Sequence, residues 1–271
     1  MNVAHDVLQL PHDEAANSDP VVALHQRLKA SYESPCDVKE RYDVIETLGK
    51  GASGFVTRVR DRNTKNLAAM KTINLDRQGK DNPNVTREID AIVKLQSNNN
   101  IVRFLDIFWG NDNQLHFVME LCNCDLSKYM VNDDQLTDRL RLNVAQQIAT
   151  GISALHNNKP PIIHRNIKPE NILIVNGERP EDIVVKLADF DISSMDVVQV
   201  DSTDTSFIPV YQTTELRGTF PYMPPECYAA IDGHGLVDGK FIFDASIDIF
   251  ALGVVYVYIF FYRSNRYGKL V

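Results

Sequence analysis

One stretch near the middle of the chain decides the fold, and it reads Ile162-Ile163-His164-Arg165-Asn166-Ile167-Lys168-Pro169-Glu170-Asn171-Ile172-Leu173. It follows a long predicted helix over residues 138–156. A second motif comes after it and reads Lys186-Leu187-Ala188-Asp189-Phe190-Asp191. Further along, residues 218–226 read Gly-Thr-Phe-Pro-Tyr-Met-Pro-Pro-Glu, and residues 248–253 read Asp-Ile-Phe-Ala-Leu-Gly.

Upstream of that stretch, residues 49–56 have the glycine spacing G-x-G-x-x-G-x-V. Glycines let the backbone approach phosphates closely and adopt conformations that a Cβ forbids. The dinucleotide-binding fingerprint has the same spacing but requires a helix to follow. Here residues 56–60 alternate like a strand, which argues against a dinucleotide site.

Lys71 closes an apolar run over residues 68–70. A protein interior disfavours an unpaired ammonium group, so this lysine needs an anion nearby. Glu88, on the next predicted helix, is the natural partner. Lys71 alone is also compatible with an extended surface lysine, but its combination with the glycine loop and Glu88 favours a functional pair.

Together these segments resemble the eukaryotic protein kinase superfamily, of the Ser/Thr type, over residues 42–262. The family signature H-R-D-x-K-P-E-N is matched at His164, Arg165, Lys168, Pro169, Glu170 and Asn171. The chain departs from the family at Asn166, where the signature has aspartate, and at Asp191, where the D-F-G motif has glycine. Residues 224–226 read Pro-Pro-Glu where the family has Ala-Pro-Glu.

The resemblance implies an α+β bilobal fold, with a β-rich N-lobe over residues 41–120 and a mostly helical C-lobe over residues 121–271. Short strands are expected at residues 44–48, 55–60, 67–73, 101–108 and 115–119, and helices at 84–96, 126–130 and 138–156. Residues 1–40 are expected to be a flexible extension or to carry one helix at 21–32. The sequence leaves open whether that helix docks onto the domain.

The resemblance also implies the cofactors ATP and Mg²⁺ and the residues that hold them. Lys71, held by Glu88, would contact phosphates, Lys168 would neutralise the transferred γ-phosphoryl group, and Asn171 and Asp189 would hold magnesium. The implied nucleotide contacts are Leu48, Gly49, Gly51, Gly54, Val56, Ala69, Lys71, Met119, Glu120, Cys122 and Leu173. An apolar column of Ile92, Leu105, His164 and Phe190 would link the lobes.

Asn166 stands where the family has its catalytic base. Its side-chain oxygen accepts a hydrogen bond but does not take a proton near pH 7, and general-base help is worth about 10²–10⁴-fold in rate. Asp191 would add a metal ligand or repel the phosphates. In the family, an arginine at the position of Arg165 often binds a phosphorylated residue of the activation loop, here residues 189–226. The candidate phosphate acceptors are Ser202, Thr203, Thr205, Ser206, Thr213 and Thr214. Thr219 is expected to be structural.

The chain ends at Val271, soon after Asp248, whereas kinase C-lobes continue with further helices. The sequence therefore predicts an incomplete C-lobe, and leaves open a fragment, a truncated product or a domain completed by another chain. Two functions remain possible: a Ser/Thr protein kinase weakened at Asn166, and a pseudokinase that acts as a regulatory module binding nucleotide or a protein partner.

Composition bounds the remaining possibilities. The chain has 271 residues, 44% of them hydrophobic, and a net charge of −8, which argues against broad binding to nucleic acid or an anionic membrane. No secretory signal is visible, and the apolar run over residues 250–262 is too short to span roughly 30 Å of hydrocarbon. Four cysteines without framework spacing fit reduced thiols, and so a cytoplasmic protein. The expected partner is a protein substrate or regulator, and the oligomeric state is not readable.

Overall fold

A computed structural model describes most of the chain. The described residues are 20–51, 54–74, 89, 95–111, 114–131, 136–159, 161–177, 179, 182–189, 198–200, 210–213, 218–234, 236–237 and 239–261. Several residues singled out by sequence lie outside these ranges: Glu88, Ile92, Phe190, Asp191, Ser202, Thr203, Thr205, Ser206 and Thr214. The chain divides into two compact units: residues 1–83 with 103–121, and residues 84–102 with 122–271.

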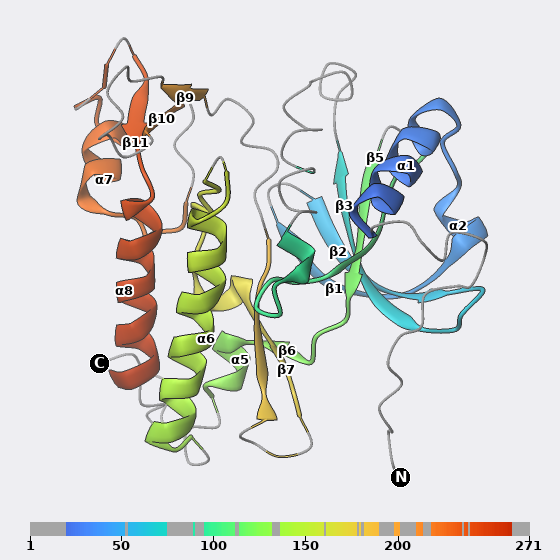
Figure 1. The fold of residues 1–271 in the computed structure, drawn as a ribbon, viewed down its shortest axis with the longest axis horizontal. Coiled ribbons are helices and arrows are strands. Elements are labelled where there is room, and N and C mark those ends of the chain that lie inside the picture. The colour runs from blue at the N-terminus through green and yellow to red at the C-terminus, as the bar shows by residue number, and fades with distance from the viewer. Residues whose placement is uncertain are drawn as a thin grey trace. The chain divides into compact units, whose positions relative to one another are not determined.

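The first unit is built on one antiparallel sheet with the strand order β1-β2-β3-β5-β4 (Figure 1). Its strands are β1 Tyr42–Gly51, β2 Gly54–Asp61, β3 Leu67–Asn74, β4 Phe104–Trp109 and β5 Gln114–Glu120. The strand expected at residues 101–108 begins only at Phe104. Ile101 instead forms an isolated parallel bridge with Leu187 of the second unit's own sheet.

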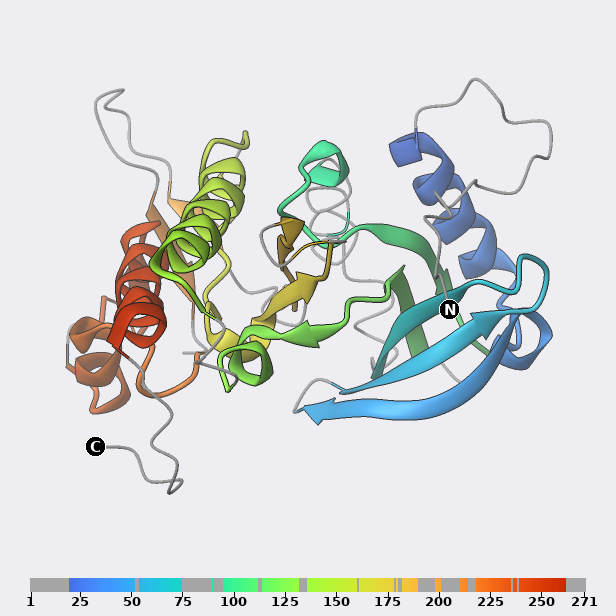
Figure 2. The same cartoon turned by 90° about the horizontal axis from the view of Figure 1, so that it is seen from below.

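The open edge of this sheet, β4, is covered by the N-terminal extension. Helix α1 (Pro20–Glu33) packs against β4 and buries Leu24 and Leu28 (Figure 2). Ser31 Oγ accepts a hydrogen bond from the Trp109 backbone N–H at 3.0 Å, and the Cys36 N–H donates to the Trp109 carbonyl at 3.2 Å. The extension thus satisfies backbone groups that an exposed edge strand would offer to other chains.

A buried carboxylate secures the connection that follows. Helix α2 (Val38–Arg41) leads into β1, and Asp106 on β4 is 2% exposed. Its side chain accepts hydrogen bonds from Arg41 and, at 3.2 Å, from the Tyr42 hydroxyl, and it lies 3.8 Å from the Arg27 guanidinium. A buried carboxylate is stable only with such partners, so residues 20–42 belong structurally to the first unit.

The second unit is mostly helical, and together with the β-rich first unit it fits the predicted α+β class. Its helices are α5 Leu126–Tyr129, α6 Asp138–His156, α7 Pro225–Ile231 and α8 Ser246–Phe261, with short 3₁₀ helices η1 Leu95–Ser97 and η3 Pro169–Asn171. One sheet consists of β6 Cys124–Asp125, β7 Ile172–Val175 and β8 Val184–Leu187, and another of β9 Val198–Val200, β10 Val210–Thr213 and β11 Phe241–Phe243.

Helices α6 and α8 lie side by side in the second unit (Figure 1). Thr137 caps α6 by accepting a hydrogen bond from the Leu140 N–H at 3.2 Å, a favourable start for a helix. Across the contact, the Tyr256 hydroxyl donates to the Ala145 carbonyl at 2.9 Å. The apolar run that begins at Phe250 lies within α8, which starts earlier, at Ser246. Its inner face is buried, while side chains such as Val257 are exposed.

Candidate active site

Asp248, near the start of α8, binds the backbone of the motif at residues 162–173, which we call the catalytic loop. This side chain is fully buried and accepts hydrogen bonds from the backbone N–H groups of His164 and Arg165, both at 2.8 Å. His156 Nε2, at the end of α6, lies 2.8 Å from the same carboxylate. Arg165 adopts a left-handed backbone with φ of 61°. The Asp248 anchor therefore fixes a conformation that costs free energy for a residue with a Cβ.

His164 is held in its neutral form. Its Nε2 lies 3.0 Å from the Ala188 carbonyl, and its Nδ1 lies 3.4 Å from the Asn166 backbone N–H. Donation at Nε2 and acceptance at Nδ1 are possible together only in the neutral ring. Burial lowers the pKa of His164 despite the opposing charges of Asp248 and Asp189.

We therefore expect the free energy of unfolding to fall as the pH drops below about 6.5, the ordinary histidine pKa. Below that pH the unfolded chain binds a proton that folded His164 does not, so this contribution is complete above pH 6.5. The slope from one histidine is at most about 1.4 kcal/mol per pH unit. Urea unfolding between pH 7.5 and 5 measures it, and the His164→Phe variant should show a flatter profile. An equal slope in the variant would contradict the assignment.

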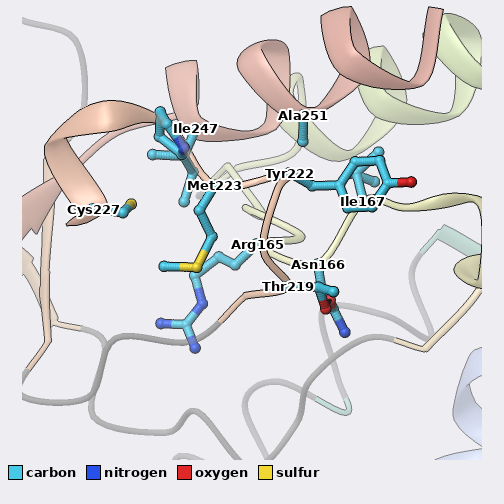
Figure 3. A pocket seen from close by; sticks show the side chains of 10 residues that line it. Arg165, Asn166, Ile167, Thr219, Tyr222, Met223, Cys227, Ile247 and Ala251 are labelled. Carbon is cyan, nitrogen blue, oxygen red and sulfur yellow. Dashed lines mark hydrogen bonds between the residues drawn. The ribbon is translucent and has the colours of Figure 1, made fainter. Parts of the chain in front are cut away.

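Asn166, Lys168 and Thr219 form a continuous hydrogen-bonded chain. The Lys168 ammonium donates to Thr219 Oγ1 at 3.0 Å, and the Thr219 hydroxyl donates to Asn166 Oδ1 at 3.1 Å. Figure 3 shows Asn166 and Thr219 side by side at one end of a pocket. The structure thus brings two predicted catalytic residues together through Thr219, which the sequence predicts to be structural.

The two residues predicted to hold magnesium are also neighbours. Asn171 Nδ2 donates to the Asn166 backbone carbonyl at 2.8 Å, which leaves Asn171 Oδ1 as an acceptor. The Ala188 N–H donates to the Asn171 carbonyl at 3.0 Å, so Asp189 directly follows a residue bonded to Asn171. The described residues contain no group of three or more His, Cys, Asp or Glu side chains suited to a metal. One carboxylate and one amide oxygen fit Mg²⁺, which keeps water and phosphate ligands.

In the first unit, the glycine motif forms a hairpin between β1 and β2. Residues 49, 50 and 51 pair with 56, 55 and 54. Gly54 has φ of 147°, and a Cβ there would lie 1.9 Å from the Thr72 carbonyl oxygen, so only glycine fits. A strand follows the motif, as expected for a phosphate-binding hairpin rather than a dinucleotide-binding turn.

The remaining predicted nucleotide contacts are distributed over both units. On β3, Lys71 is 8% exposed and pairs with Val56 on one side and Phe117 on the other. Ala69 pairs with Met119, and Glu120 accepts a hydrogen bond from the Arg103 N–H at 2.7 Å.

Among the other expected contacts, Leu48 lies on β1 and is 44% exposed. Cys122 and Leu173 belong to the second unit, Leu173 on β7 opposite Asp125. The proposed partner of Lys71, Glu88, lies outside the described residues.

A sheet that no sequence pattern predicted lies beside the catalytic loop. β10 pairs with β11, and the rings of Tyr211 and Phe243 stack with centroids 5.9 Å apart. The Arg165 guanidinium lies over the Phe243 ring at 5.6 Å from its centroid, a cation–π contact. Short strands distant in sequence give no periodic signal, although the aromatic run at residues 241–243 is a β-propensity signal.

Two negative observations apply to the part of the chain that the structure describes. None of its helices combines the length and hydrophobicity needed to cross a membrane. None of the four cysteines there (Cys36, Cys122, Cys124 and Cys227) forms a disulfide. Burial raises the pKa of Cys227 to about 11, with a smaller effect from Glu226, so this thiol is unreactive near neutral pH.

Several curated proteins resemble the chain. Serine/threonine-protein kinase tousled-like 2 of Xenopus tropicalis is 26% identical over 239 residues, which are 86% of this chain and 33% of that protein. Cyclin-dependent kinase 1 of Encephalitozoon cuniculi is 28% identical over 80% of this chain and 65% of its own length. Serine/threonine-protein kinase TIO of Arabidopsis thaliana is 31% identical over 85% of this chain and 16% of its own. The chain thus spans a third of the tousled-like relative and under two thirds of the others.

The protein kinase domain family matches residues 42–267, which is most of the chain. The match covers the glycine hairpin, the buried lysine on β3, the catalytic loop and the start of α8. In the structure, strand pairing places the glycine hairpin and the lysine, and hydrogen bonds join the catalytic loop to the start of α8. The chain belongs to the protein kinase family.

Proposed function

We propose that the chain binds Mg·ATP and transfers its γ-phosphoryl group to the hydroxyl of a serine or threonine in a protein. The observation that carries this proposal is the set of hydrogen bonds around Asn166. Lys168 is linked to the Asn166 side chain through the Thr219 hydroxyl, and Asn171 donates to the Asn166 backbone carbonyl. Phosphoryl transfer depends mainly on positioning and charge neutralisation. Both are supported by residues that this chain retains.

In this proposal, the residues that the family membership implies hold the nucleotide. Lys71 and the glycine hairpin would bind phosphates, and Asn171 and Asp189 would hold Mg²⁺, which neutralises phosphate charge when bound. Adenine would contact Val56 and Ala69 of the first unit. Further contacts would come from Leu48, Met119, Glu120 and Cys122.

The reaction breaks the bond between the γ-phosphorus and the bridging oxygen and forms one to the acceptor oxygen. ADP leaves, and the hydroxyl proton is released. The Thr219 hydroxyl bridges Lys168 and Asn166, and the Lys168 ammonium group would neutralise the charge of the transferred phosphoryl group. Asn166 cannot take the proton near pH 7, so we propose that transfer is slow.

The second candidate function is that of a pseudokinase, a nucleotide-responsive module that regulates a protein partner. Asn166 and Asp191 favour it, because both replace residues of the catalytic motifs. Because the four described cysteines form no disulfide, we further propose that the protein works in a reducing, cytoplasmic environment.

A transfer assay with γ-labelled ATP and a mixed protein acceptor tests the proposal. We expect slow labelling of serine and threonine that Lys71→Met reduces by about 10²-fold or more, as for the loss of one charge-stabilising group. The exposed Lys39→Met variant is the control and should behave like the unchanged chain. Equal labelling by the unchanged chain and Lys71→Met would attribute the signal to a contaminant and contradict the proposal.

A further inference from the structure

We infer that Thr219 holds Asn166 with its amide nitrogen, rather than its oxygen, toward the position of the acceptor hydroxyl. This inference deepens the proposed function and rests on it for the meaning of that position. It makes Thr219 a positioning residue and gives Asn166 an active role, as a hydrogen-bond donor to the acceptor oxygen.

The direction of the hydrogen-bonded chain follows from what each group can do. An ammonium group only donates, so Lys168 Nζ, 3.0 Å away, must donate to Thr219 Oγ1. The single hydroxyl proton of Thr219 is then available for the atom 3.1 Å away on Asn166. In the structure that atom is Oδ1, the only acceptor of the carboxamide, so the Thr219 hydroxyl donates to it. Donation from Lys168 leaves the Thr219 proton free for Asn166, which is consistent with the amide orientation that the structure shows.

The backbone on both sides of the Thr219–Asn166 hydrogen bond is itself held by contacts, so a loop movement does not readily reorient the Asn166 amide. Asn171 Nδ2 donates to the Asn166 carbonyl at 2.8 Å, and the Asn166 N–H points at His164 Nδ1. Before Thr219, Gly218 has φ of 150°, and a Cβ there would lie 2.7 Å from Met223 Cγ. Within the described ranges, the Asn166 amide nitrogen has no hydrogen-bond partner.

An aspartate at this position would behave differently. A carboxylate has two acceptor oxygens, one for Thr219 and one for the acceptor hydroxyl. Asn166 has one oxygen, engaged by Thr219, and an N–H₂ group at the other end. Donation from that group makes the hydroxyl oxygen a weaker nucleophile, whereas a carboxylate would accept its proton. The site would then hold an acceptor oxygen, that of a hydroxyl or of a phosphoester, without activating it.

Side-chain amide exchange tests the orientation without any need for activity. In a sample labelled with ¹⁵N-asparagine, the Asn166 amide signals are identified by their loss in Asn166→Asp. We expect their protons to exchange with water as fast as those of an exposed asparagine. The Asn171 amide is the internal control, and its bonded proton should be protected because Asn171 is 6% exposed. A protected Asn166 amide proton that Thr219→Val releases would overturn the inference.

A double-mutant cycle in transfer rate tests the consequence. Thr219→Val should slow transfer in the Asn166→Asp chain, because an orienting hydrogen bond is lost. In the unchanged chain it should slow transfer about tenfold less, because the freed amide can turn its oxygen to the hydroxyl. Thr219→Ser keeps the hydroxyl and should restore both rates. Equal fold-changes in the two backgrounds would overturn the inference. If no chain transfers phosphate, the proposed function fails, and amide exchange alone decides the orientation.

Discussion

Replacing Asn166 with aspartate is expected to raise the single-turnover rate of phosphoryl transfer by about 10²–10⁴-fold, the usual worth of a general base. The partners for a carboxylate are already in place. Thr219 donates to this side chain at 3.1 Å, and the surrounding backbone is held by Asn171 at 2.8 Å. The new carboxylate would accept the hydroxyl proton without any rebuilding of the loop.

A rapid-quench assay with saturating Mg·ATP and a protein acceptor measures this rate. Asn176→Asp is the control, because it adds the same charge at an exposed position of the second unit and should leave the rate unchanged. If Asn166→Asp transfers no faster than the unchanged chain, the missing base is not the chief defect. The regulatory-module alternative would then be favoured.

Replacing Asp248 with alanine is expected to lower the free energy of unfolding by about 3–5 kcal/mol, the cost of breaking a buried hydrogen-bond network. The substitution leaves the backbone N–H groups of His164 and Arg165 without their acceptor and removes the partner of His156. Because the side chain is fully buried, water cannot readily replace it.

Urea unfolding of the second unit, followed by circular dichroism, measures this cost. Asp232→Ala removes a carboxylate from an exposed position at the end of α7 and should change stability by less than about 0.5 kcal/mol. A loss below about 1 kcal/mol for Asp248→Ala would show that the anchor does not hold the catalytic loop.

Much of the fold follows from local sequence signals. The helix expected at residues 138–156 has those bounds in the structure, because Thr137 is a strong cap and the apolar spacing continues throughout. The strands around the glycine motif follow from alternation and from the turn residues between them. In contrast, the β9-β10-β11 sheet is stabilised by pairing between strands of only three or four residues, which are too short to give a local pattern.

The candidate site is predictable where a motif is contiguous. Lys168 and Asn171 are both bonded around Asn166, as expected from a single loop. The Asp248 anchor was not predictable in the same way. Asp248 lies 84 residues from His164 in sequence, so its contact depends on how α8 packs in the second unit. The predicted pairing of Lys71 with Glu88 stays a prediction.

The central claim, that this protein kinase chain binds Mg·ATP, is tested most directly by its thermal unfolding midpoint with and without the nucleotide. Ligand at about 100 times its Kd adds about 2.7 kcal/mol, which corresponds to a rise of roughly 5–10 °C for a chain of this size. We predict such a rise with Mg·ATP and a smaller one when magnesium is withheld, because Asn171 and Asp189 would then lack their ion. A cooperative transition with an unchanged midpoint at saturating Mg·ATP would contradict the account.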